Sequence, residues 1–347
     1  MRTHSRRRRT AALLLAAAPI FAAAQSTPAG QGVAAAVEDR PDRVDVRRVF
    51  RIEDDRVTES SGFAISRTRP GLAYTVNDSG DAARVLVIAM DNGAVVGETR
   101  LTGVQAVDVE ALAPAPGGRL VVADIGDNGA ERDSVELYVI DEPRRGATTD
   151  YPVRVTLTYP GRPVDAEAAV VVGRRLYVVT KEVLGGTVFA APVFMSTQRR
   201  GYVLRRVGPA PTLVTDGTRL EDGSVVLRDY YRAYLLRLPS WRVTASYPLP
   251  RVEQGETVAA SPGRRAVYVG SEGEGSPVFM VRFPAQQADG RQAPSRTSPT
   301  PGPSEEAPNA QADTEHPRAR PPGYVVAVVA ALAVTILVGR YRRRGGR

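Results

Sequence analysis

The strongest constraint on the fold is an internal repeat of short, β-branched strands that occupies residues 44–285. Five copies of one pattern follow one another, and each opens with a strand that is polar at its start and apolar afterwards. These first strands are expected at 61–65, 110–113, 167–171, 216–220 and 256–260. A second, more apolar strand and a third strand follow in every copy. Self-similarity of this kind is typical of repeat architectures.

A fourth strand is expected in four of the copies, whereas the fifth copy lacks one. The four are at 95–99, 153–157, 202–206 and 243–247. Residues 44–52 form an additional strand before the first copy. We therefore predict an all-β fold, a β-propeller of five four-stranded blades, in which this N-terminal strand completes and closes the last blade. Six or seven blades are the alternative, if the long second and third copies conceal merged units.

The basic character of the chain comes from its two ends. The formal net charge is +8, with 46 Lys and Arg against 38 Asp and Glu. Ten arginines lie in the first nine and last eight residues, and without them 36 basic residues face 38 acidic ones. The high isoelectric point therefore reports membrane topology and not a polyanionic partner, and we expect no nucleic-acid binding.

The N-terminal residues have the three parts of a secretory signal peptide, expected at 1–24. Basic residues 6–9 precede an apolar run, and small residues at 22–24 provide a cleavage site. A disordered segment is expected at 25–43. The chain has no cysteine, which excludes disulfides, thiol nucleophiles and cysteine-ligated zinc.

The C-terminal residues are typical of a membrane anchor. An uncharged apolar segment, 323–339, is long enough to span a bilayer as a transmembrane helix, and the basic residues 340–347 would remain in the cytoplasm. Residues 286–322 are rich in Pro, Ser and Thr and should form a disordered linker. We expect a single-pass protein of the cell membrane, with the propeller on the extracytoplasmic side.

Acidic residues recur at one register of the repeat and should gather at one end of a central channel. Just before or at the start of the first strands stand Glu59, Asp108, Glu110, Asp165, Glu167 and Glu256. Just after the second strands stand Asp78, Asp127, Lys181, Glu182, Arg228, Asp229 and Glu272. Because the second strand runs antiparallel to the first, both series should reach the same end of the propeller.

All of these residues except Asp78 and Asp127 form the candidate ligand-binding site, and Asp78 and Asp127 join three of its acids in a candidate metal site. Clustered carboxylates raise one another's pKa unless a positive charge compensates. Ca²⁺ suits an all-oxygen site outside the cytoplasm, and its candidate ligands are Asp78, Asp108, Glu110, Asp127 and Glu167. Lys181, the only lysine, and Arg228 are the alternative compensating charges. Tight turns alone could explain Asp78 and Asp127.

The histidine count limits the chemistry of the site. The two histidines lie in the predicted signal peptide and linker, which argues against zinc and excludes a Ser-His-Asp mechanism. Carboxylate acid/base chemistry, metal-assisted hydrolysis and a lysine nucleophile remain open.

A series of short motifs resembles a family of exported, largely actinobacterial propeller proteins of unestablished function. The motifs are Glu59-Ser-Ser-Gly, Asn77-Asp-Ser-Gly, Asp108-Val-Glu, Ala123-Asp-Ile-Gly-Asp-Asn128, Asp165-Ala-Glu, Thr180-Lys-Glu and Gln254-Gly-Glu. The family is similar in outline to WD40-like and to phytase-like or esterase-like propellers, and the resemblance covers about residues 57–284. It often has Trp where this chain has Val109.

Two functions from different classes follow from these observations. One is a surface module that binds a metal ion, a cationic ligand or an unknown extracytoplasmic protein at the acidic end of the channel. The other is a Ca²⁺-dependent hydrolase of phosphoester, ester or carbohydrate-like substrates. Fold alone does not decide between them, so whether the protein is an enzyme stays open.

Overall fold

The computed structural model describes residues 44–191 and 201–284, which form five β-sheets. The first sheet contains β2 (Ser60–Ile65), β3 (Leu72–Asn77), β4 (Arg84–Ala89), β5 (Val95–Leu101) and β9 (Gly146–Asp150). The second contains β6 (Val109–Ala115), β7 (Arg119–Asp124), β8 (Val135–Asp141), β10 (Val153–Thr158) and β14 (Gly201–Val203).

The other three sheets have four strands each. The third contains β11 (Ala166–Val172), β12 (Arg175–Thr180), β13 (Gly186–Ala190) and β15 (Arg205–Ala210). The fourth contains β16 (Asp216–Arg219), β17 (Val225–Arg228), β18 (Arg232–Arg237) and β19 (Arg242–Pro248). The fifth contains β20 (Thr257–Ala260), β21 (Ala266–Gly270), β22 (Ser276–Arg282) and β1 (Asp45–Ile52).

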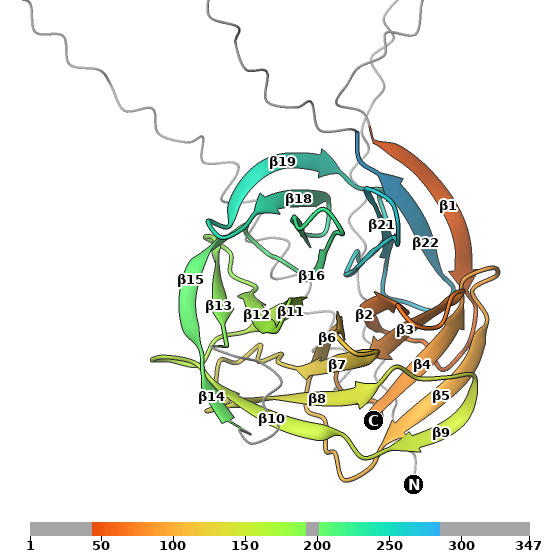
Figure 1. Ribbon diagram of the computed structural model, residues 1–347, viewed down its shortest axis with the longest axis horizontal. Helices are drawn as coiled ribbons and strands as arrows, with labels where there is room; N and C mark the ends of the chain where they lie inside the picture. Colours follow the sequence, from red (N-terminus) through yellow and green to blue (C-terminus); the bar gives the residue numbers. More distant parts are fainter. Residues whose placement is uncertain (1–43, 192–200, 285–347) are drawn as a thin grey trace, which may run out of the picture. The chain divides into compact units, whose positions relative to one another are not determined.

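These sheets are arranged around a common centre as the blades of a propeller, with β2, β6, β11, β16 and β20 as the first strands (Figure 1). The prediction of an all-β propeller with five blades is confirmed, and the six- or seven-bladed alternative is wrong. The extra length of the second and third copies forms β9 and β14 instead of a further blade. Each pairs in parallel with the outer strand of the preceding blade, β9 with β5 and β14 with β10.

The predicted fourth strand of the third copy, 202–206, is wrong in its boundaries. The segment divides into β14, which joins the second blade, and β15, which completes the third. Tyr202 and Leu204 are buried in the core between these two blades, and Leu204 N donates a hydrogen bond to Thr158 O at 2.8 Å. The apolar residues that suggested one strand thus serve a neighbouring blade.

The strand at the start of the described chain lies in the last blade. β1 pairs antiparallel with β22 from Asp45 opposite Arg282 to Ile52 opposite Ser276, with one bulge between Arg48 and Phe50. It is therefore the outermost strand of the fifth sheet.

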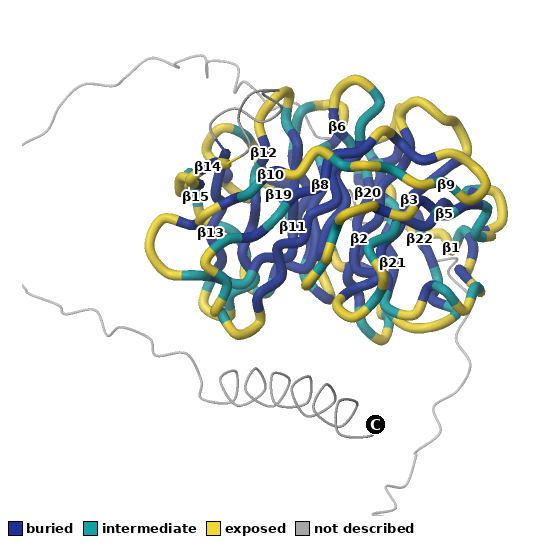
Figure 2. The backbone as a smooth tube through the Cα atoms, turned by 90° about the horizontal axis from the view of Figure 1, so that it is seen from below, coloured by how far each residue is buried: buried dark blue, intermediate teal, exposed yellow. Residues whose placement is uncertain are grey.

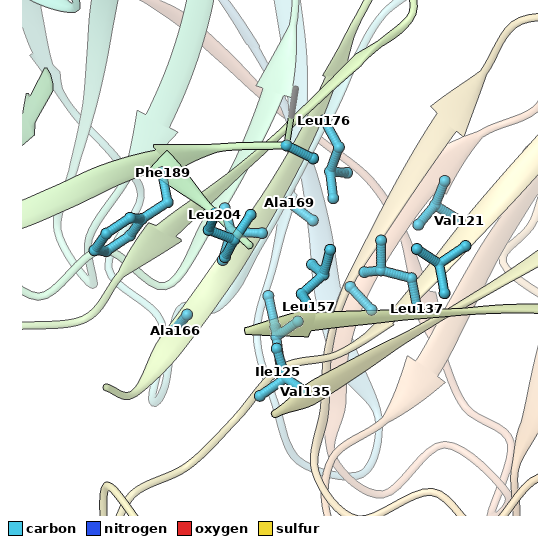
Figure 3. Close-up of a cluster of buried hydrophobic side chains, with 14 of the residues drawn as sticks. Val121, Ile125, Val135, Leu137, Leu157, Ala166, Ala169, Leu176, Phe189 and Leu204 are labelled. Atoms are coloured by element: carbon cyan, nitrogen blue, oxygen red, sulfur yellow. The ribbon is translucent and has the colours of Figure 1, made fainter. Parts of the chain in front are cut away.

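The hydrophobic core lies between adjacent blades, and this explains the sequence pattern of the strands. Inner strands such as β2 and β3 are buried along their whole length because both faces contact a neighbouring sheet, whereas the outer strand β10 alternates between exposed and buried residues. Figure 2 shows buried strands joined by exposed connections. Figure 3 shows the core between the second and third blades, where Leu137 and Leu157 face Ala169 and Leu176.

The predicted signal peptide, linker, transmembrane helix and basic tail all lie outside the described residues. Within residues 44–191 and 201–284, the structure contains no helix with the length and hydropathy to cross a membrane.

Candidate functional site

The strand register brings the two predicted series of polar residues to one end of the propeller, which we call the acidic face. In every blade the start of the first strand pairs with the end of the second strand. The pairs are Ser60 with Asn77, Val109 with Asp124, Ala166 with Thr180, Asp216 with Arg228, and Thr257 with Gly270. The residues just before the first strands therefore lie beside those just after the second strands.

A β-bulge recurs at the start of the first strand in three consecutive blades. The register shifts between Ser60 and Gly62, between Val109 and Ala111, and between Ala166 and Ala168. The unpaired residues are Ser61, Glu110 and Glu167, each only 1% exposed. Because a bulge redirects a side chain, it turns these groups away from the regular alternation of the strand. Two of the predicted acids, Glu110 and Glu167, are thus bulge residues with buried side chains.

Three carboxylates of neighbouring blades meet on the acidic face and form the acidic triad, Asp78, Asp108 and Glu110. One oxygen from each lies within 4.8 Å of the other two. Asp78 follows β3, Asp108 precedes β6, and Glu110 is the bulge residue of β6. Asp78 and Glu110 are buried, and Asp108 is half-buried. The geometry matches a small all-oxygen cation site.

Glu110 is the least compensated member of the triad. Its Oε2 accepts a hydrogen bond from Ser61 Oγ at 2.7 Å, but its buried Oε1 has no hydrogen-bond partner. Burial raises the pKa of Glu110 well above its usual value, and the carboxylates of Glu167, Asp78 and Asp108 raise it further. An ionised Glu110 therefore needs a positive charge beside Oε1.

Gly126 forms one wall of this triad. Its N–H donates to Asp108 O at 3.1 Å, and a Cβ atom added at Gly126 would lie 2.5 Å from Asp108 Oδ2 and 2.7 Å from Glu110 Oε1. Asp108 Oδ2 and Glu110 Oε1 therefore both lie close to the Cα of Gly126. The Glu110 oxygen that has no hydrogen-bond partner is thus on the side of Asp108. Even the methyl group of alanine would collide with them.

The other half of the acidic face contains an ion pair. Lys181 Nζ lies 2.5 Å from Glu167 Oε1 and 5.4 Å from the centre of the Tyr230 ring. Burial alone would lower the pKa of Lys181, but the facing Glu167, Tyr230, Glu256 and Glu110 raise it well above its usual value. Lys181 is therefore held as an ammonium ion, which argues against a lysine nucleophile.

Arg228 has a structural position. It is 1% exposed, and its guanidinium donates to Thr257 O at 2.9 Å and Gly270 O at 3.1 Å, which joins the fourth and fifth blades. Burial lowers its pKa to about 10, so it stays charged at neutral pH. Its N–H groups are turned toward backbone carbonyls and not toward the triad.

The carboxylates of Asp127 and Asp165 accept hydrogen bonds from backbone N–H groups. Asp127 accepts hydrogen bonds from the backbone N–H groups of Glu131 and Arg132, both at 2.9 Å, and Asp165 accepts one from the Asp127 N–H at 2.9 Å. Asp127 is therefore a turn residue, as the alternative interpretation holds, and its carboxylate is not in the triad. Glu167 is also outside the triad because it pairs with Lys181.

Asp229 and Glu182 likewise stabilise loops of the acidic face. Asp229 accepts a hydrogen bond from Tyr234 OH at 2.7 Å, and Glu182 accepts one from Thr180 Oγ1 at 2.7 Å.

The last three predicted residues, Glu59, Glu256 and Glu272, also lie on this face. Glu256 is buried and accepts a hydrogen bond from Gln254 Nε2 at 2.8 Å. The backbone of Glu59 accepts from Asp78 N, and that of Glu272 donates to Gln254 O, both at 2.9 Å.

Three residues of the site were missed as site residues in the sequence: Ser61, Gly126 and Tyr230. Ser61 occupies the same repeat position as Glu110 and Glu167, so the alignment of the copies carried the signal. Gly126 and Tyr230 had no comparable signal, because their importance comes from contacts with side chains of other strands.

No protein-family model matches the chain, and no curated protein matches its sequence. Among solved structures, a glutaminyl cyclase from Myxococcus xanthus is similar over 71% of this chain and 99% of its own, with 13% identity and a TM-score of 0.46. The gluconolactonase XC5397 from Xanthomonas campestris is similar over 73% and 94%, with 14% identity and a TM-score of 0.43. An auxiliary nutrient binding protein from Bacteroides thetaiotaomicron is similar over 70% and 77%, with 10% identity and a TM-score of 0.45. These likenesses carry no functional argument, and the resemblance to the exported family stays a prediction.

Proposed function

We propose that this protein is a binding module that holds a divalent cation, most suitably Ca²⁺, in the acidic triad. The observation that carries the proposal is the buried Oε1 of Glu110, which has no hydrogen-bond partner although its carboxylate meets those of Asp78 and Asp108. A buried carboxylate without a partner is costly, and coordination to a cation would remove that cost.

The ligand set favours a hard cation. Carboxylate oxygens suit Ca²⁺ and Mg²⁺, and Ca²⁺ takes six to eight oxygens in flexible geometry. Three side chains would leave coordination positions for water or for a ligand. Gly126 supports this role because its missing side chain leaves the two facing oxygens of Asp108 and Glu110 uncovered on that side.

Coordination positions that the three side chains leave open could hold a water molecule, which is what the hydrolase alternative requires. A metal-bound water could attack a phosphoester or ester, with the triad as the metal holder. A turnover screen of the protein against phosphoester, ester and glycoside substrates, with and without Ca²⁺, separates the two functions: turnover that requires Glu110 favours the hydrolase.

The cellular place of this module is also a proposal, supported by the charge pattern of the two ends of the chain. We place the propeller on the extracytoplasmic side of the cell membrane, anchored by residues 323–339. Protease added to intact spheroplasts should then cleave the propeller, and full protection would contradict this topology.

Thermal unfolding with and without Ca²⁺ tests the cation site. At 100 times the dissociation constant, a bound ion stabilises the folded state by about 2.7 kcal/mol, which corresponds to about 5–10 °C in Tm for a domain of this size. Glu110→Gln should abolish the increase, whereas Asp91→Asn, in the exposed turn between β4 and β5, should retain it. An equal Tm in Ca²⁺ and in chelator would refute the proposal.

A further inference from the structure

Exposed apolar side chains from three of the five blades lie on the same face as the acidic centre, by which we mean the acidic triad with Glu167 and Glu256. These side chains form the apolar rim and are Val107, 55% exposed, Val183, 48%, Leu184, 98%, and Tyr231, 56%. Each is close in sequence to a residue of the site: Val107 precedes Asp108, the Val183–Leu184 pair follows Lys181, and Tyr231 follows Tyr230. The rim comes from three consecutive blades, because its loops precede β6, follow β12 and follow β17.

The loops that present the rim are held by hydrogen bonds. Val107 N donates to Asp124 Oδ2 at 3.0 Å, and Tyr231 N donates to Asp229 Oδ1 at 2.7 Å. The hairpin that contains Leu184 is fixed at its base, where Leu213 N donates to Glu182 O at 3.0 Å. Leu184 is nevertheless almost fully in water. Single exposed apolar residues are ordinary, but a group of them around a polar centre is typical of an interaction surface.

Acidic side chains outnumber basic ones among the candidate ligand-binding residues inside the rim. The candidate ligand-binding residues on this face include nine acids and only two bases. Both bases are engaged within the protein, Lys181 by Glu167 and Arg228 by backbone carbonyls. A complementary partner therefore carries a positive charge at its centre and apolar groups on either side.

The distribution of the rim residues over three blades favours a polypeptide ligand over a small molecule. Its residues belong to three separate blades, whereas an extended peptide advances about 3.3 Å per residue and can cross several loops. A small pocket has both Asp78 of the triad and Val107 of the rim in its lining, so these two residues lie beside the same hollow.

We propose that the acidic face binds an extended polypeptide segment in which a Lys or Arg residue is flanked by apolar residues. The basic side chain points to the acidic centre, and the apolar neighbours cover the rim. This interaction goes beyond the cation site and does not require a metal ion.

Fluorescence anisotropy with end-blocked, labelled heptapeptides tests this proposal on the full chain in the presence of a chelator. The reference peptide has a central Arg between leucines. One comparison peptide replaces Arg by the uncharged isostere citrulline, and the other replaces the leucines by serines. We expect saturable binding of the reference peptide and an affinity at least about tenfold lower for each comparison peptide.

Two double variants locate the interaction. Val183→Ser with Leu184→Ser removes part of the rim and should weaken the reference peptide at least about tenfold. Val203→Ser with Tyr151→Ser removes equally exposed apolar groups from β14 and from the connection between β9 and β10, and should change nothing. Equal binding of the citrulline peptide, equal loss in both double variants, or no saturable binding would each overturn the proposal. Calcium binding is measured separately, so such a failure would leave the cation site unaffected.

Discussion

Removing Lys181 offers the sharpest test of how the acidic face is held together. In the structure its ammonium lies 2.5 Å from the carboxylate of Glu167, which is 1% exposed. Lys181→Met keeps most of the apolar length of the side chain but removes the charge. Glu167 would then be buried without its cation, and it could escape this only by binding a proton.

The magnitude follows from the burial of Glu167. Burial raises the pKa of Glu167 to about 8 although the charge of Lys181 opposes the shift, so removal of Lys181 should raise this pKa further. Removing one partner of a buried ion pair typically costs about 3–5 kcal/mol, and we expect a loss of about 3 kcal/mol. For a domain of this size it lowers Tm by about 6–12 °C.

The defect should depend on pH in a definite direction. A carboxyl group whose pKa is raised by folding destabilises the protein above its unfolded pKa, and the penalty disappears as the pH falls toward that value. Because the pKa of Glu167 is raised to about 8 with Lys181 present and further without it, the Tm difference between Lys181→Met and the wild type should grow as the pH rises through about 8 and shrink below it.

Urea and thermal unfolding of the wild type, two single variants and one double variant measure this effect. Arg265→Met is the matched control, because Arg265 also lies 2.5 Å from a carboxylate, that of Asp222, but Asp222 is 42% exposed. Its loss should cost at most about 1 kcal/mol. Lys181→Met combined with Glu167→Gln should recover most of the lost stability, since no buried charge remains. A loss in Lys181→Met no larger than in Arg265→Met would refute the reasoning.

Three further predictions concern other parts of the molecule. Gly126→Ala should abolish the Ca²⁺-dependent increase in Tm without changing any charge, because its Cβ would collide with the facing oxygens of Asp108 and Glu110; an unchanged increase contradicts the assigned site. The gain in Tm from Ca²⁺ should be larger at about pH 8 than at about pH 5, because the raised pKa of Glu110 makes protons compete with the ion, and calorimetry at both values checks it. Deletion of 44–52 should cost about 3–6 kcal/mol, since it removes two buried side chains and exposes the edge of β22, and urea unfolding that matches the full chain would show that β1 is dispensable.

The sequence by itself determined the number of blades, most of the strands and the face on which the acids gather. Strand positions were readable because the inner strands are buried on both sides and therefore appear as short apolar runs, repeated five times. The shared face was readable because antiparallel pairing of consecutive strands is local, so the start of one strand must lie beside the end of the next. Ser61, Glu110 and Glu167 could be aligned for the same reason.

Only the tertiary structure decided which groups compensate each other. Glu110 and Glu167 hold equivalent bulge positions, yet Glu167 is paired with a lysine and Glu110 has an oxygen with no hydrogen-bond partner. The equivalent position after the second strand is Lys181 in the third blade and Gly126 in the second. The pairing of β9 and β14 with strands of the preceding blades could not be predicted from the sequence either. These short strands lie at the outer edge of a sheet and pair with residues that are distant in sequence. Such choices depend on distances of a few ångströms between separate sheets, and a one-dimensional pattern does not contain those distances.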